Sequence, residues 1–346
     1  MNLSVLDLSP VNAGTAPARA IRESIELAKA AERLGFNRYW LAEHHSMTAL
    51  AGTAPEILIA AISQNTSRIR LGSGGVMLPN YSPLKVAEVF MTLEALAPGR
   101  IDLGVGRALG ADMRTGAALR ASGPEAFPQY FALLSAWLLD AAGKEPFPPE
   151  HPAKGIRAQP QGPGHPDLFL LVSSVDSAVF AGRAGVGMVF SEFIARTDAG
   201  PAVRAYKAAF EPSPFRDEPF AGIGLIALAA DTAEEAERLD AVRKAAMLSF
   251  LEGREGPAPT VEEAVARLER ERDNPTLLAL ISQCITGSGE QVRAALQQKL
   301  ADSGADELFV MASGPTLESR IRSLELISPF PLEGGRVGDG GGVGSG

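Results

Sequence analysis

The sequence is poor in cysteine and histidine. Its 346 residues include one cysteine, Cys284, and four histidines. A single cysteine excludes an intrachain disulfide framework and a zinc site built from several thiolates. Proteins that rely on disulfides belong to oxidising compartments. We therefore expect this chain in the reducing cytoplasm.

Positive charge is also scarce. The chain has 32 Lys and Arg against 41 Asp and Glu, which gives a formal net charge of −9. Proteins that bind nucleic acid without sequence preference neutralise phosphates with Lys and Arg. The charge balance therefore argues against a nucleic-acid partner.

Long apolar runs are missing as well. No stretch approaches the ~18 consecutive apolar residues that a membrane span requires. The first 20 residues lack the basic start and apolar core of a signal peptide, because Asp7, Pro10 and Asn12 interrupt the opening run. Hydrophobic residues make up 46% and charged residues 21% of the chain, close to globular averages. We expect a soluble globular protein without a membrane partner.

Short apolar runs alternate with longer helical patterns along the chain. The predicted strands cover residues 3–8, 38–42, 69–75, 101–106, 168–172, 188–190, 222–229 and 307–311. Predicted helices cover about 17–34, 55–66, 82–96, 174–184, 199–210, a region from Thr232, 291–303 and 317–327. Eight strands alternating with helices predict an α/β fold of the (β/α)8 TIM-barrel type.

A doubly wound open sheet is the rival architecture. It would usually place a glycine-rich phosphate loop after the first strand, whereas Ser9-Pro10-Val11-Asn12 follows that strand here. We therefore predict one barrel domain over residues 1–330. Insertions at about 107–165, with one helix near 128–141, and at about 252–289 are expected to cover the C-terminal face. The glycine-rich tail, 331–346, is expected to be disordered.

Polar residues directly after the strands are the candidates for chemistry, because barrel enzymes act at the C-terminal ends of their strands. His44 and His45 are adjacent, so on an extended segment they point to opposite faces. This disfavours a two-histidine metal site, and we predict no metal. One imidazole is a candidate proton donor or acceptor, and a strand-end histidine bonded to backbone is the alternative. Position alone leaves both open, as it does for the carboxylates Asp7, Glu43 and Glu192.

An anion site is predicted after the fourth and fifth strands. Gly106 and Arg107 follow one strand, and Ser173, Ser174 and Ser177 begin the helix after the other. Backbone N–H groups and the helix dipole favour an anion at such a helix start. Taken singly, Ser174 is more simply a helix cap and Arg107 a solvated side chain. Together on neighbouring strands, they favour a phosphate.

Three segments carry a resemblance to a known family. They are 39–45 (YWLAEHH), 72–79 (GSGGVMLP) and 98–107 (PGRIDLGVGR). The chain resembles the bacterial luciferase-like flavin-dependent monooxygenase superfamily over about residues 1–329. The resemblance implies a barrel that takes reduced FMN from a separate flavin reductase. Through a flavin hydroperoxide formed with O2, it would oxygenate a small organic substrate.

The resemblance also implies roles for particular residues. His44 matches the histidine important for luciferase chemistry, and Gly74-Gly75 matches the place of a non-proline cis peptide under the flavin ring. The implied cofactor-binding set is Gly74, Gly75, Gly106, Arg107, Leu109, Val172, Ser173, Ser174 and Ser177. Position alone suggests Ser9, Ser191, Glu192 and Phe193 as substrate-pocket residues.

The sequence also departs from luciferase. Gly106 stands where luciferase has a reactive cysteine, and the second phosphate arginine is not placed, with Arg114 and Arg120 as alternatives. The 107–165 insertion is not luciferase-like, so aldehyde specificity and light emission do not transfer. Related proteins pair through the helices after the second and third strands, which implies a homodimer. The alternatives are a deazaflavin-dependent oxidoreductase and a non-catalytic flavin-binding or partner subunit.

Overall fold

The computed structural model describes residues 1–254, 256, 258–277 and 284–328. Eight parallel strands form a closed barrel, in which β6 pairs with β7, and β9 pairs with β1. The barrel strands are β1 Leu3–Asp7, β2 Arg38–Leu41, β3 Arg70–Met77, β4 Ile101–Gly106, β5 Asp167–Val172, β6 Gly187–Ser191, β7 Ala221–Ala230 and β9 Glu307–Ala312. The predicted (β/α)8 fold is confirmed. The predicted disordered tail lies outside the described residues.

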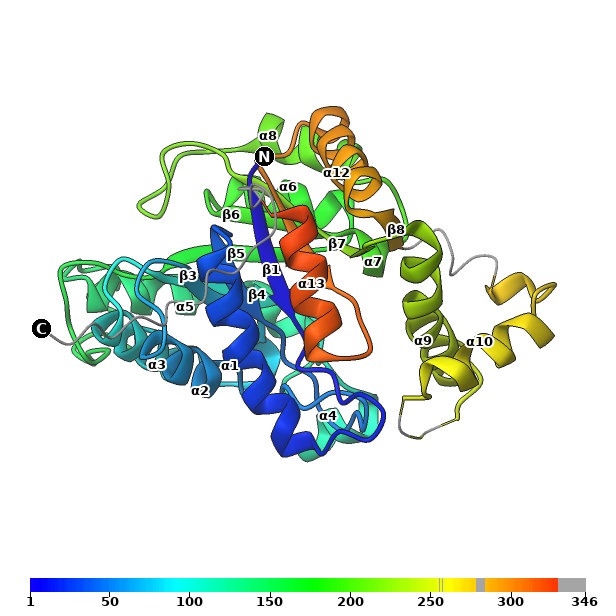
Figure 1. Ribbon diagram of the computed structural model, residues 1–346. Helices are drawn as coiled ribbons and strands as arrows, with labels where there is room; N and C mark the ends of the chain where they lie inside the picture. Colours follow the sequence, from blue (N-terminus) through cyan, green and yellow to red (C-terminus); the bar gives the residue numbers. More distant parts are fainter. Residues whose placement is uncertain (255, 257, 278–283, 329–346) are drawn as a thin grey trace, which may run out of the picture.

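Helices between the strands form the outer layer (Figure 1). The longer ones are α1 Pro17–Arg33, α2 Pro55–Ser63, α3 Pro83–Leu96, α5 Phe127–Ala141, α6 Val175–Arg183, α8 Gly200–Ala209, α9 Ala233–Leu251, α12 Gly289–Ser303 and α13 Leu317–Ile327. Proline is the first residue of α1, α2 and α3, where its missing N–H costs no helical hydrogen bond. Among the described helices, none is long and apolar enough to cross a membrane.

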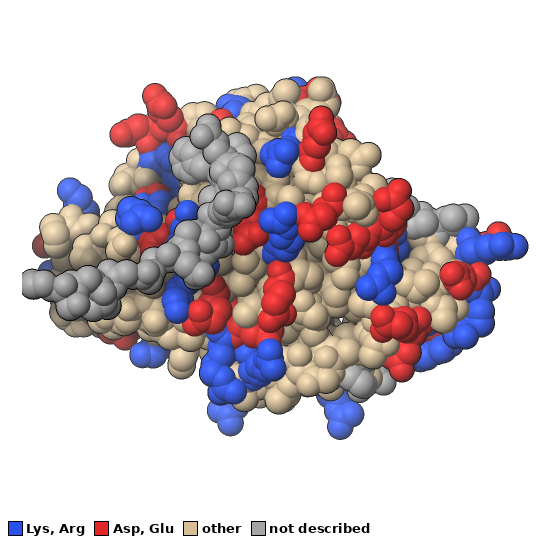
Figure 2. All heavy atoms as spheres, in the orientation of Figure 1, with Lys and Arg blue, Asp and Glu red and all other residues tan. Residues whose placement is uncertain are grey.

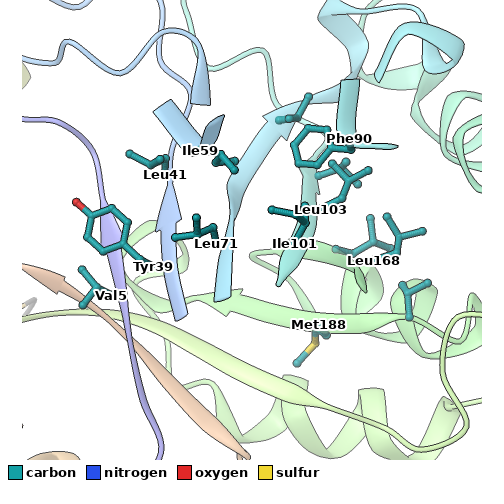
Figure 3. Close-up of a cluster of buried hydrophobic side chains, with 14 of the residues drawn as sticks. Val5, Tyr39, Leu41, Ile59, Leu71, Phe90, Ile101, Leu103, Leu168 and Met188 are labelled. Carbon is teal, nitrogen blue, oxygen red and sulfur yellow. The ribbon is translucent and has the colours of Figure 1, made fainter. Parts of the chain in front are cut away.

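Alternating strand residues build two apolar layers. Side chains such as Val5, Leu41, Leu71 and Leu103 point outward and pack against the helices (Figure 3). The barrel interior is filled by a separate cluster in which Trp40 lies 4.4 Å from Phe309 and 5.0 Å from Phe169, between ring centroids. The interior is therefore a packed core rather than a channel, as in other barrels of this size.

Buried ion pairs close the N-terminal end of the barrel. Arg38 Nη1 lies 2.7 Å from Asp102 Oδ2, and Arg38 Nε lies 3.4 Å from Glu307 Oε2. Arg70 Nη2 is 2.6 Å from Asp102 Oδ1. The two arginines and two carboxylates form one connected network that fills the N-terminal end of the barrel. A ligand is thus left with the opposite, C-terminal end.

The two insertions contain more regular structure than predicted. The first holds α4 Met113–Ala118 and a short 3-10 helix, Pro124–Ala126, in addition to α5. The second contains α10 Val261–Arg270 and β8 Cys284–Ser288, neither of which is among the elements predicted from the sequence. The strand β8 pairs with residues 226–230 of β7, beyond the part of β7 that β6 covers. A long β7 leaves an open edge there, and β8 fills it.

Surface charge is mixed on the side of the molecule drawn in Figure 2. Lys and Arg side chains alternate there with Asp and Glu and form no continuous basic stripe. Helices α9 and α10 pack on each other through Ala241, Val242, Ala245 and Ala264. They lie to one side of the barrel, to the right in Figure 1.

Candidate functional site

His44 follows β2 at the C-terminal end of the barrel. Its backbone N–H donates to the Gly52 carbonyl at 2.9 Å, which fixes the turn. The imidazole is half-buried, and its Nδ1 atom has no hydrogen-bond partner within the described part of the chain. Burial and the neighbouring His45 lower the pKa of His44. A neutral ring with one unsatisfied nitrogen is suited to accept or pass on a proton.

His45 is bonded to groups other than His44. Its Nε2 atom lies 2.7 Å from Glu43 Oε1, and its backbone N–H donates to the Gly110 carbonyl at 2.9 Å. The side chain of His45 is thus engaged by Glu43. Across the residues that the structure describes, no group of three His, Cys, Asp or Glu is arranged to hold a metal ion.

Two buried glycines, Gly74 and Gly75, lie in β3 beside β2. The Gly74-Gly75 peptide is cis, which confirms the implied cis bond at this position. A Cβ on Gly75 would lie 2.7 Å from the Gly104 carbonyl oxygen and 2.8 Å from Leu171 Cδ1. A Cβ on Gly74 would lie 2.7 Å from Leu6 Cδ1. No side chain fits at either glycine, because neighbouring protein atoms already occupy the space that a Cβ would need.

Arg107 and the start of α6 lie side by side at the same barrel end. Val105 of β4 pairs with Leu170 of β5, which brings Arg107 level with Val172, one residue before Ser173. The Arg107 side chain is exposed and makes no hydrogen bond or ion pair with any residue that the structure describes. Ser174 caps α6 by accepting the Ser177 N–H at 3.3 Å. An unpaired guanidinium beside a capped helix start is suited to a phosphate.

The other implied cofactor residues differ in what they present. Gly106 is buried, and a Cβ there would lie 3.2 Å from Met77 Sδ. The Leu109 carbonyl accepts from Asn80 Nδ2 at 3.0 Å, which anchors the loop after β4. The Val172 side chain packs in the outer core, so only its backbone can face a cofactor.

The four positional pocket residues separate into two pairs. Ser191 is buried at the end of β6, and Phe193 packs against the apolar cluster inside the barrel. Ser9 is fully buried with its hydroxyl 2.8 Å from Ser24 Oγ. Glu192 forms an ion pair with Lys299 at 2.8 Å. Ser9 and Glu192 are thus already engaged in the scaffold.

Two features at this end escaped sequence reasoning. Leu8, Leu171 and Met311 pack above the barrel interior and remain partly exposed. These residues could have been found from the sequence, because each lies two positions after an inward-pointing residue (Leu6, Phe169 or Phe309) and so faces the same side of its strand. The second feature is a buried pair of Asp7 with Arg320, joined by Tyr39, whose hydroxyl donates to Asp7 Oδ2 at 2.6 Å. Despite burial, Arg320 and these hydrogen bonds lower the pKa of Asp7.

Comparison with known proteins agrees with this geometry. The family model described as luciferase-like monooxygenase matches residues 1–307. The chain belongs to this family. A luciferase-like monooxygenase of Escherichia coli K12 is 37% identical over 326 residues, covering 93% of this chain and 95% of that protein. N-acetyl-S-alkylcysteine monooxygenase of Bacillus subtilis 168 is 36% identical over 298 residues, covering 86% and 88% respectively.

Solved structures that resemble this chain include an FMN complex and an F420-dependent enzyme. The crystal structure of apo-MsnO8 has a TM-score of 0.86 and 39% identity, covering 94% of this chain and 96% of that one. The oxygenating constituent of 3,6-diketocamphane monooxygenase, in complex with FMN, has a TM-score of 0.67 and 20% identity, with coverage of 95% and 97%. An F420-dependent secondary alcohol dehydrogenase has a TM-score of 0.64 and 14% identity, with coverage of 96% and 100%. The last two share the fold.

Proposed function

We propose that this chain is an FMN-dependent monooxygenase that uses reduced FMN and O2 to oxygenate a small organic substrate. The observation that carries the proposal is the convergence of three features at one barrel end. They are the unsatisfied Nδ1 of half-buried His44, the side-chain-free wall at Gly74-Gly75, and the unpaired Arg107 beside the start of α6. When bound, the reduced flavin supplies the electrons that activate O2.

The protein groups have separate tasks in this proposal. Arg107, together with Ser173, Ser174 and the first N–H groups of α6, binds the phosphate. Gly74-Gly75 lets the flat ring lie against backbone. His44 holds or moves one proton on its imidazole ring, and its lowered pKa favours the neutral form of that ring.

A deazaflavin coenzyme is the second candidate, because F420-dependent enzymes share this fold. The two readings differ in the coenzyme and in oxygen use. Thermal-shift titrations with FMN and with F420 should give a larger stabilisation by FMN. Reduced FMN, supplied by NADH and a separate flavin reductase, should then support oxygen-dependent turnover in a panel of ketones, aldehydes and thioethers. Stabilisation by F420 alone, with no oxygen-dependent product, would favour the deazaflavin-dependent oxidoreductase.

We also infer a homodimer that forms through α2 and α3. Ile57 and Leu96 are 67% and 50% exposed, and they line a surface groove of about 630 Å³ between these helices. Exposed large apolar side chains that line one groove are typical of a protein interface. Sedimentation velocity should give a dimer for the natural chain and a monomer for Ile57→Asp. A natural chain that sediments as a monomer at micromolar concentration would contradict the dimer.

A further inference from the structure

Glu43 is a buried carboxylate that the proposed chemistry does not use. Its side chain is 0% exposed. One oxygen, Oε1, accepts from His45 Nε2 at 2.7 Å, the Tyr81 hydroxyl at 2.9 Å and Asn80 Nδ2 at 3.2 Å. The other, Oε2, accepts the Met77 backbone N–H at 3.1 Å. A carboxylate is costly to bury unless hydrogen bonds replace its lost water, so this convergence of donors explains its place.

The donors come from segments that otherwise lie apart in the chain. Met77 ends β3, and Asn80 follows it in the 3-10 helix Leu78–Asn80. Asn80 Nδ2 also donates to the Leu109 carbonyl, and the His45 N–H donates to the Gly110 carbonyl. The carboxylate therefore lies where the ends of β2 and β3 meet the loop after β4.

The backbone packs closely at the same point. Gly110 has a positive φ of +64°, and a Cβ there would lie 2.8 Å from the Glu43 carbonyl oxygen. Burial and the Glu43 carboxylate raise the pKa of Tyr81, so the Tyr81 hydroxyl stays protonated and remains a donor. The loop after β4 is thus held against Glu43 by both hydrogen bonds and close contact.

These three segments carry the residues to which the proposed function assigns the flavin. His44 follows Glu43 directly, Gly74-Gly75 lies just before Met77, and Arg107 begins the loop after β4. We propose that Glu43 is a positioning residue, which fixes these segments relative to one another before the cofactor binds. The inference rests on the proposed function for its cofactor, and on the hydrogen bonds above for its geometry.

A carboxylate suits this place because the Met77 N–H, the Asn80 amide nitrogen and the Tyr81 hydroxyl all donate to it. Two ionised oxygens accept all of these hydrogen bonds, whereas a glutamine has one oxygen and an NH2 group. In Glu43→Gln the NH2 group must face either the Met77 N–H or the donors on the Oε1 side. Side-chain volume is kept, but at least one segment loses its acceptor and should move.

The test compares Glu43→Gln with Glu307→Gln. Glu307 is also a buried carboxylate, but it lies at the N-terminal end of the barrel and accepts from Ser4 and Arg38. Both variants should unfold at a lower temperature. In the cofactor-free protein, only Glu43→Gln should speed amide hydrogen exchange in residues 76–81 and 107–111. Its Kd for FMN, measured by flavin fluorescence, should rise about tenfold, whereas Glu307→Gln should stay within about twofold of the natural chain.

Other results would overturn the proposal. Natural exchange rates and FMN affinity in Glu43→Gln would do so, and so would an equal loss of affinity in Glu307→Gln. If Glu43→Gln does not fold, Asn80→Ala removes the hydrogen bond to the Leu109 carbonyl together with one of the hydrogen bonds to Glu43. Unchanged exchange in residues 107–111 of that variant would then refute the idea. If the natural chain binds neither FMN nor F420, the proposed function fails. Hydrogen exchange alone then decides whether Glu43 orders the segments.

Discussion

Arg107→Ala should weaken FMN binding strongly and riboflavin binding little. In the free protein Arg107 is exposed and pairs with none of the residues that the structure describes, so its removal should change the free energy of unfolding by less than about 0.5 kcal/mol. Hydrogen bonds to a charged group contribute about 1.5–3 kcal/mol. The Kd for FMN should therefore rise about 10- to 150-fold. Riboflavin has the same ring without the phosphate, so its Kd should change less than about threefold.

The assay is quenching of flavin fluorescence, run for both ligands on each variant. Arg183→Ala is the matched control, because Arg183 lies in the last turn of the same helix whose first turn faces Arg107. That variant should bind both flavins as the natural chain does. An equal loss of FMN and riboflavin affinity in Arg107→Ala would refute the reasoning, since it would mean that Arg107 supports the ring site rather than the phosphate.

Three more predictions concern the ring end of the site. His44→Ala should lower oxygen-dependent turnover by about 10²- to 10⁴-fold with FMN affinity within a few-fold, and a loss of binding with unchanged turnover would contradict the role. Because the folded-state pKa of His44 lies below its usual 6.5, its neutral form contributes stability above pH ~6.5 that is lost as the pH falls. The natural chain should therefore lose more unfolding free energy than His44→Gln between pH 7.5 and pH 5 in urea titrations, and parallel pH profiles would disprove this. Gly75→Ala should cost about 1–3 kcal/mol of unfolding free energy, because its Cβ meets the fixed Gly104 carbonyl. Gly162→Ala should be nearly neutral, because its Cβ would only contact Met91 Cε, at an ordinary van der Waals distance of 3.8 Å.

The barrel could be predicted because each of its strands is a distinct apolar run followed by a helical pattern. The buried ion pairs at the N-terminal end of the barrel could not be predicted. Arg38, Asp102 and Glu307 come from three distant strands and meet only when the barrel closes. The strand β8 has a similar origin. The short segment Cys284–Ser288 becomes a strand because residues 226–230 of β7 offer an open edge. The local sequence of the segment does not indicate that such an edge is present.

Site prediction depended on motif more than on pattern. Periodicity alone leaves His44 open between a catalytic and a structural histidine. The resemblance favours the catalytic role, which stays a prediction. The cis bond at Gly74-Gly75 likewise came from the resemblance and is present. The sequence placed Glu43 only by position, because its importance lies in donors such as Met77 and Tyr81, more than 30 residues away. For α10, the Thr260 and Glu263 capping box was a readable signal.

A crystal structure with FMN bound tests the central claim most directly. The account predicts the phosphate against Arg107, Ser174 and the first turn of α6, with the flavin ring between Gly74-Gly75 and the imidazole of His44. FMN bound elsewhere, or with its phosphate away from Arg107 and the start of α6, would contradict it.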